Sequence, residues 1–241
     1  MRWTGVGKKL ESICRKAIYE FGLLEGVQKL GIALSGGKDS LTLLHLLKGM
    51  VGRGIPELEL CAIHVAGEFS CGPSVTEGFL RKVCGELNVP FVVRSSLQKR
   101  ETLQCYSCSR ERRRLIFTAA KEVGITTIAF GHHRDDSIET VLLNLLHKAE
   151  FAGMLPKVPM HDYGVVIIRP LIYAAENQIR EFAEKNGFAR IVCQCPVGQK
   201  SKRKKVKDLL QELEREFPNS RTNLAKASLK FGSKKALNMV S

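Results

Sequence analysis

A short glycine-containing segment that joins an apolar run to a helical pattern constrains the fold more than any other feature. Leu30–Leu34 is a continuous apolar run of the kind that forms a buried strand. Ser35–Ser40, with the sequence Ser-Gly-Gly-Lys-Asp-Ser, follows directly, and leucines then recur at helical spacing at positions 41, 43, 44, 46 and 47. The sequence therefore predicts a strand, a tight loop and a helix, the unit from which parallel sheets are built.

The chemistry of this loop suits phosphate groups. Gly36 and Gly37 allow the backbone to approach an anion closely, and the start of the following helix aims free N–H groups at it. Lys38 adds a positive charge, and Asp39 can hold magnesium on a pyrophosphate group. The alternative is a plain strand-to-helix connection. The loop predicts nucleotide binding by Ser35, Gly36, Gly37, Lys38, Asp39 and Ser40.

The rest of the chain alternates between strand and helix patterns. Further strands are expected at 58–65, 91–93, 127–130 and 165–168, and helices at 10–21, 75–87, 109–123, 136–147 and 175–186. This order predicts an α/β fold, a parallel sheet with helices on both faces and ligands at the carboxyl ends of its strands. The expected parts are an N-terminal helical segment (1–26), the sheet domain (27–190) and a cysteine motif with a basic helical tail (191–241), loosely packed or partly disordered from 217.

A second polar motif, Gly131–Thr140, follows an apolar strand pattern and opens another helix. A carboxylate here would bind magnesium or orient a reacting group, and a histidine or Arg134 would offset charge on a phosphate. The more modest interpretation is that one aspartate only caps the helix. We expect catalytic roles for Lys38, Asp39, Asp135 and Asp136, with His132 in the nucleotide site.

The chain has eight cysteines, and four of them form two close pairs. Cys105 and Cys108 have the spacing that lets two thiolates meet one metal, and Cys193 and Cys195 lie far along the chain. Spacing leaves zinc, an iron–sulfur cluster and a redox pair open. The thiols in apolar patterns are expected in the core, at positions 14, 61 and 84.

Charge indicates the partner. The formal net charge of +14 favours polyanions, and a dense basic segment predicts contact with nucleic-acid phosphates through Lys200, Lys202, Arg203, Lys204 and Lys205. A solvated charged surface is the alternative. No apolar stretch reaches the length of about 20 residues that a membrane span needs, so a cytoplasmic protein is expected.

In their order along the chain, these motifs resemble the tRNA 2-thiocytidine synthetases. The resemblance rests on the Ser35–Ser40 loop, Cys105–Arg110, Gly131–Asp136 and Gly153–Lys157, and it covers nearly the whole chain. It implies the fold of the PP-loop ATP pyrophosphatases, which is adenine nucleotide alpha hydrolase-like. It also implies an enzyme that uses ATP and magnesium to adenylate C2 of cytidine 32 in the tRNA anticodon loop and then replaces that oxygen by sulfur.

The same resemblance implies a 4Fe-4S cluster held by three cysteines. Cys105 and Cys108 match the first pair of ligands. The family ends with a second C-x-x-C motif, whereas this chain has C-x-C, so Cys193 is expected as the third ligand narrowly ahead of Cys195. Sulfur would come from a cysteine desulfurase or another donor.

Other interpretations stay open. Thiolation of a tRNA uridine would use the same loop and cluster, although the chain lacks cysteine pairs of a zinc ribbon at its ends. Lysidine synthesis on an isoleucine tRNA would need the loop without the cysteines. A metal-stabilised tRNA-binding module without ATP turnover is disfavoured by the complete Lys38–Asp39 pair. The N-terminal helix would either form a homodimer or close the chain's own sheet.

Overall fold

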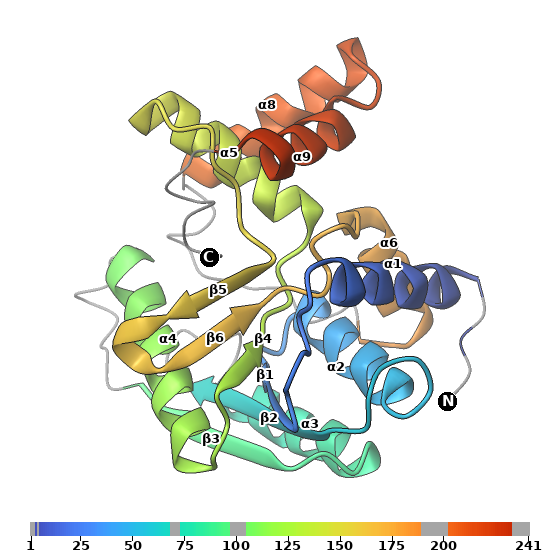
Figure 1. The fold of residues 1–241 in the computed structure, drawn as a ribbon, viewed down its shortest axis with the longest axis vertical. Coiled ribbons are helices and arrows are strands. Elements are labelled where there is room, and N and C mark those ends of the chain that lie inside the picture. The colour runs from blue at the N-terminus through green and yellow to red at the C-terminus, as the bar shows by residue number, and fades with distance from the viewer. Residues whose placement is uncertain (1–2, 4, 68–72, 97–104, 189–201, 233–241) are drawn as a thin grey trace.

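The computed structural model describes residues 3, 5–67, 73–96, 105–188 and 202–232 (Figure 1). Within these residues the strands form a six-stranded sheet in the order β3-β2-β1-β4-β6-β5. All neighbours are parallel except β5, which runs antiparallel to β6 at one edge. The bounds are β1 (Lys29–Ala33), β2 (Glu59–Ala66), β3 (Phe91–Ser95), β4 (Thr127–Ala129), β5 (Lys157–Met160) and β6 (Val165–Ile168).

The predicted α/β fold is confirmed, with one strand added. Sequence patterns did not predict β5, because its four residues show no alternation and include Pro159. A short 3-10 helix (His161–Tyr163) and Gly164 turn the chain back into β6.

Helices cover both faces of the sheet. One face carries α1 (Val6–Glu20), α2 (Lys38–Met50), α3 (Pro73–Glu86) and α6 (Glu176–Lys185), whose apolar side chains share one core with the strands. The other face carries α4 (Cys105–Glu122), where Phe117 is buried in a cluster with residues of the strands, including Ile63 and Ile128.

The N-terminal helix closes the chain's own sheet, as one of the two interpretations predicted. Residues of α1, including Leu10 and Ile18, are buried in the core shared with α2 and α6. Cys14, Cys61 and Cys84 are buried thiols, as expected, and burial raises the pKa of Cys84 to about 11. The proposed division at residues 26 and 190 stays a prediction.

A helical unit made of α5 (Arg134–Lys148), α8 (Lys202–Glu216) and α9 (Ser220–Phe231) projects from the sheet (Figure 1). Its apolar cluster consists of Ile138, Val206, Leu210 and Ala225. The expectation of a loosely packed tail from residue 217 does not hold for α9, which packs against α5 and buries Ala225 and Ser228. In the part of the chain that the structure describes, no helix is both long and apolar enough to span a membrane.

Candidate functional site

A cavity of about 440 Å³ lies at the carboxyl edge of the sheet, where a ligand is expected in this fold. The first turns of α2 and α5 reach it, and α4 forms one wall. Its lining is Ala33, Leu34, Ser35, Asp39, Ser40, Val65, Ser109, Arg112, Arg113, Ile116, Phe130, Gly131, His132, Asp136, Met154, Ile167 and Arg169. The cavity thus brings together residues from both predicted motifs.

The glycine loop is a closed turn at the start of α2. The backbone N–H of Ser35 donates to Oγ of Ser40 over 3.2 Å, and this hydroxyl donates to the carbonyl oxygen of Gly37 over 3.0 Å. Gly36 has a φ of 88°, a conformation that favours glycine. Since the first N–H groups of a helix have no partner within it, the turn presents donors where an anion can approach.

The second motif touches the backbone of the first at Gly131. A Cβ atom at this position would lie 2.9 Å from the carbonyl carbon of Asp39 and 3.0 Å from the backbone nitrogen of Ser40. Only glycine permits this approach, because those atoms belong to the main chain and cannot rotate away. Gly131 therefore joins the two motifs into one site.

The carboxylates of Asp39 and Asp136 face the same imidazole. Nε2 of His133 lies 3.7 Å from Oδ1 of Asp39 and 3.4 Å from Oδ2 of Asp136. Burial alone would raise the pKa of Asp136, but His133 and His132 lower it below its ordinary value. Nδ1 of His133 is buried without a partner among the described residues. His133 was not among the predicted site residues, although the His-His pair in the motif was a signal for it.

Asp135 and Asp136 have separate roles. Oδ1 of Asp135 accepts a hydrogen bond from Arg221 of α9 over 2.7 Å, and Oδ2 accepts one from the backbone N–H of Glu176 over 2.9 Å. Asp135 is buried and does not belong to the cavity lining, and the catalytic role predicted for it stays a prediction. Successive residues of a helix point about 100° apart, so only one of the two aspartates can face the cavity.

Lys38 lies beside the cavity and is held by two acids. Its Nζ is 2.9 Å from Oδ1 of Asp39 and 3.4 Å from Oε1 of Glu176. Burial would lower the pKa of Lys38, but these carboxylates outweigh it, and the pKa is raised above 10.5. Glu176, the first residue of α6, was not predicted, because one acid at a helix start has no distinctive sequence pattern.

Arginines give the opposite wall of the cavity its charge. Arg112 and Arg113 come from α4, and Arg169 follows β6. Nδ1 of His132 accepts a hydrogen bond from Nε of Arg169 over 3.4 Å. Burial and Arg169 lower the pKa of His132 to about 4, and burial and Arg113 lower the pKa of Arg169 to about 10. The imidazole is thus neutral and the guanidinium charged at neutral pH, in a site suited to an anion.

These arginines were missed by sequence reasoning, although both places carried a signal. Arg112 and Arg113 follow the first cysteine pair within one helical pattern. Arg169 ends the apolar strand pattern at 165–168, where the carboxyl edge of the sheet lies.

The first cysteine pair is placed by α4. Cys105 and Cys108 lie in its first turn, and their positions continue at helical spacing toward Ser109 and Arg112 of the cavity wall. The side chains of both cysteines lie outside the described part, as do Cys193 and Cys195 entirely. Among the described residues no three His, Cys, Asp or Glu side chains form a metal site. The predicted metal ligands, including Asp39, therefore stay a prediction.

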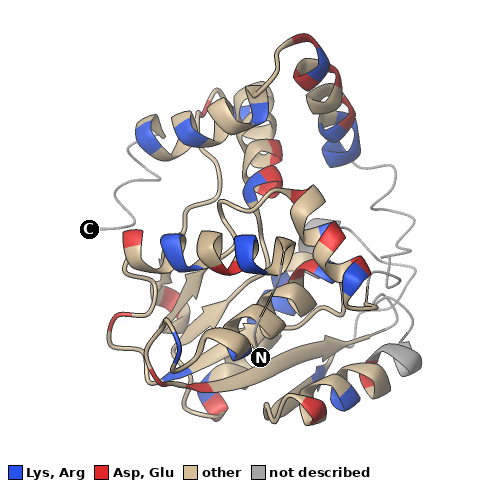
Figure 2. Ribbon diagram, turned by 90° about the vertical axis from the view of Figure 1, so that its right-hand side faces the viewer, with Lys and Arg blue, Asp and Glu red and all other residues tan. Residues whose placement is uncertain are grey.

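The described residues of the basic segment are all exposed, and two of them also form ion pairs. Lys202 and Lys205 are exposed on the first turns of α8, where blue residues cluster beside the grey trace in Figure 2. Arg203 lies 3.4 Å from the buried carboxylate of Glu139, and Lys204 pairs with Asp208 on the same helix. Lys200 lies outside the described residues.

Comparisons with known proteins show the family of the chain. A family model described as a PP-loop domain matches residues 6–213. A tRNA-cytidine(32) 2-sulfurtransferase of Anaeromyxobacter dehalogenans (strain 2CP-C) is 39% identical over 231 residues, which cover 91% of this chain and 78% of that protein. The protein of the same name from Geobacter sulfurreducens is 33% identical, and the match covers 91% of this chain and 88% of that protein.

A solved structure is also similar to this chain over most of the length of both. It is the U34-tRNA thiolase NcsA from Methanococcus maripaludis with its 4Fe-4S cluster, which has a TM-score of 0.74 and 26% identity. The match covers 92% of this chain and 76% of that one. With its family match, its relatives and its cavity taken together, the chain belongs to the PP-loop family and, within it, to the family of the tRNA-cytidine(32) 2-sulfurtransferases.

Proposed function

We propose that the protein is a tRNA sulfurtransferase that uses ATP to activate C2 of cytidine 32 and then replaces its oxygen by sulfur. The observation that carries this proposal is the cavity where two helix starts, the acids Asp39 and Asp136 and several arginines converge. The curated relatives that carry the name of this activity support it.

The nucleotide fits the cavity by size and charge. A volume of about 440 Å³ is in the range of small-molecule sites. The loop at the start of α2, Arg112, Arg113 and Arg169 would bind the phosphates. Because Nδ1 of neutral His132 accepts from Arg169, its proton is on Nε2, which can donate to the nucleotide.

Magnesium is proposed between the carboxylates that face His133. Asp39 and Asp136 both line the cavity, and oxygen ligands of this kind suit Mg²⁺ together with phosphate and water. Asp39 is also the partner of Lys38, so the metal and the ammonium group would share the charge of the leaving pyrophosphate.

The chemistry needs activation because an amide-like carbonyl oxygen is a poor leaving group. Transfer of AMP to this oxygen turns it into a good one, which sulfur then displaces. Residues of the chain would hold the phosphates, exclude water and position the cytosine base. Positioning of this kind lowers the barrier for transfer of AMP and for displacement by sulfur. A cytosine of a single-stranded RNA loop can be splayed out to enter such a cavity.

Thiolates would hold the 4Fe-4S cluster, and an iron without a protein ligand supplies a position for sulfide when the cluster is bound. The donor chemistry fits, since Cys105 and Cys108 lie in the first turn of the helix that lines the cavity. Cys193, or else Cys195, would be the third ligand. A cysteine desulfurase or another donor would supply sulfur in the cytoplasm, and the protein would act as a monomer or as a homodimer.

The test is mass spectrometry of tRNA nucleosides from cells with and without the gene. We expect 2-thiocytidine to disappear without it, to return with the wild-type protein and to stay absent with Cys105→Ala or Asp136→Asn. Unchanged 2-thiocytidine would contradict the proposal. Loss of 2-thiouridine instead would establish the second candidate, uridine thiolation, which the similarity to the U34-tRNA thiolase favours.

A further inference from the structure

One carboxylate connects the nucleotide loop to the basic helix α8. Oε1 of Glu176 lies 3.4 Å from Nζ of Lys38, and Oε2 lies 2.7 Å from Nζ of Lys207. Arg180 also approaches Oε1 at 3.5 Å. The glutamate side chain is only 16% exposed, so solvent screens these pairs weakly.

The position of Glu176 is fixed from several sides. Its backbone N–H donates to Asp135, which is itself bound to Arg221. Glu176 is the first residue of α6, so its carboxylate lies at a helix start, where the helix dipole favours negative charge. Although burial alone would raise its pKa, Lys207 and Lys38 hold the pKa of Glu176 at about 2. It is therefore a permanent anion at neutral pH.

The ammonium group of Lys38 can pair with Asp39 or with Glu176, and the pair that it forms affects the proposed metal site. Asp39 lies next to Lys38 in the sequence and binds its ammonium group through both oxygens, at 2.9 and 3.2 Å. Without Glu176, the ammonium group would be left to Asp39 alone. An ammonium group that occupies Asp39 competes with a cation for the same oxygens.

Resting on the function proposed above, we propose that Glu176 is a positioning residue that shares the ammonium group of Lys38 with Asp39 and so leaves the oxygens of Asp39 available to a cation, and that Lys207 serves the nucleotide site by fixing Glu176. The basic segment then has two faces with different tasks. Exposed Lys202 and Lys205 bind RNA phosphates, while half-buried Lys207 contacts Glu176 and supports ATP and magnesium binding.

The experiment compares Glu176→Gln, Lys207→Met and the double variant with the wild-type holoenzyme. ATP affinity is measured by calorimetry at several Mg²⁺ concentrations, tRNA affinity by filter binding, and AMP formation by steady-state kinetics. We expect each single variant to weaken ATP binding about tenfold and to need more Mg²⁺, because one member of a shielded charge pair is lost. The double variant should be no weaker than Glu176→Gln, since both act through one carboxylate.

Contrasting variants make the test specific. Lys205→Met should weaken tRNA binding and leave ATP affinity unchanged, whereas Lys207→Met should do the reverse. Lys207→Arg should restore most of the ATP affinity. Glu181→Gln, which removes an exposed acid from the same helix, is the matched control and should match the wild type.

Additive effects in the double variant would overturn the inference, as would a loss of tRNA affinity in Lys207→Met with normal ATP affinity. If Glu176→Gln fails to fold, Lys207→Met carries the test alone, because its side chain is at the surface end of the pair. Calorimetry of ATP does not depend on turnover. A wild-type protein that binds ATP but makes no 2-thiocytidine would thus contradict the proposed function and leave the role of Glu176 to be decided by affinity.

Discussion

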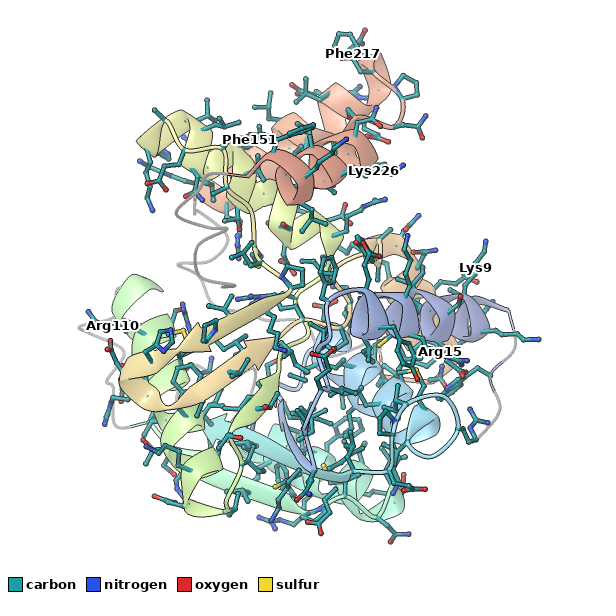
Figure 3. The ribbon with its side chains drawn as sticks, in the orientation of Figure 1. Lys9, Arg15, Arg110, Phe151, Phe217 and Lys226 are labelled. Carbon is teal, nitrogen blue, oxygen red and sulfur yellow. The ribbon has the colours of Figure 1, made fainter. Side chains whose placement is uncertain are left out.

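The sheet and the helical unit of α5, α8 and α9 differ in what holds them together. On both faces of the sheet, side chains are fully buried in continuous apolar clusters, such as Leu44 on one face and Phe117 on the other. The cluster of the helical unit is small. Two aromatic side chains of the unit are exposed, Phe231 and, at its tip, Phe217 (Figure 3). Charged pairs join its helices to each other and to α6, namely Arg221–Asp135, Arg203–Glu139 and Lys207–Glu176.

The nucleotide site therefore lies between a sheet that is stabilised by apolar burial and a helical unit that is held largely by ion pairs. Apolar burial depends on area, whereas a shielded ion pair depends on both partners being present. The sheet should therefore unfold as one unit, and α8 and α9 should be able to open locally without it.

The largest expected effect is on the sheet core. Leu44→Ala removes a fully buried side chain from α2, and we expect the free energy of unfolding in urea to fall by about 3–4 kcal/mol. Leu209→Ala is the matched control on α8, where the leucine is 41% exposed, and it should cost less than about 1 kcal/mol. Equal losses at the two positions would remove the basis of the comparison.

A smaller and more local effect is expected at the pair that fastens α9. Arg221→Ala removes the nearer of two cations from the buried carboxylate of Asp135 and leaves Arg134 at 3.5 Å, which costs about 3 kcal/mol locally. Hydrogen exchange should show lost protection in α8 and α9 and unchanged protection in β1 and β4. Lys226→Ala removes an exposed charge from the same helix (Figure 3) and should change neither. Loss of protection in the strands would show that the two regions are not separable.

Acid should destabilise the sheet region through a half-buried histidine. Burial lowers the pKa of His45, on α2 beside Phe188, from 6.5 to about 4. The unfolded chain takes up this proton near pH 6.5 and the folded chain only near 4, so stability falls as the pH drops through this window. We expect His45→Gln to remove about 2 kcal/mol of this loss, measured as the unfolding free energy at neutral pH against that near pH 4.5.

Acid should spare the ion pairs of Glu176 but weaken the Arg203–Glu139 pair, because burial raises the pKa of Glu139. Glu176 stays ionised until about pH 2, so its pairs persist across the window in which His45 titrates. The protection factors of the α8 amides around Lys207, corrected for the pH dependence of intrinsic exchange, should therefore change little between the two pH values. An unchanged slope in His45→Gln would show that other groups carry the acid sensitivity, and His64 and His132 are then the next to replace.

Salt should have the smallest effect, and it should act on α8 and α9 and not on the strands. Raising KCl from about 0.1 to about 1 M weakens partly exposed pairs such as Arg203–Glu139, where Arg203 is 44% exposed. We expect exchange in α8 and α9 to speed up by a few fold, equivalent to about 1 kcal/mol or less, with the strands unaffected. Slower exchange in α8 at high salt would mean that apolar packing dominates there.

The parts of the fold that sequence could predict are those with strong local patterns. The leucine spacing of α2 and the apolar run of β1 have fixed periods, and the turn between them carries its own glycine signal. The strand β5 has no such pattern, since its residues are half-buried at an edge and gain their conformation only by pairing with β6. The packing of α9 likewise depends on a partner, because Arg221 reads as a solvated charge until Asp135 is placed beside it.

The site divides in the same way. Ser35, Asp39, Ser40, His132 and Asp136 were predicted from their motifs and do line the cavity. Asp135 could not be told from Asp136, because their difference is a rotation about the helix axis. Glu176 and Arg169 come from elements far along the chain, and only the tertiary fold brings them to the loop.

The contact at Gly131 places a limit on how this site can change over generations. Any side chain there would meet the main chain of Asp39 and Ser40, so a compensating replacement nearby cannot make room for it. The presence or absence of glycine at position 131 can therefore be used to sort sequences that share the fold. Those that keep glycine can still close the junction between their two motifs, and those that have lost it must have separated them and, with that, the shared nucleotide site.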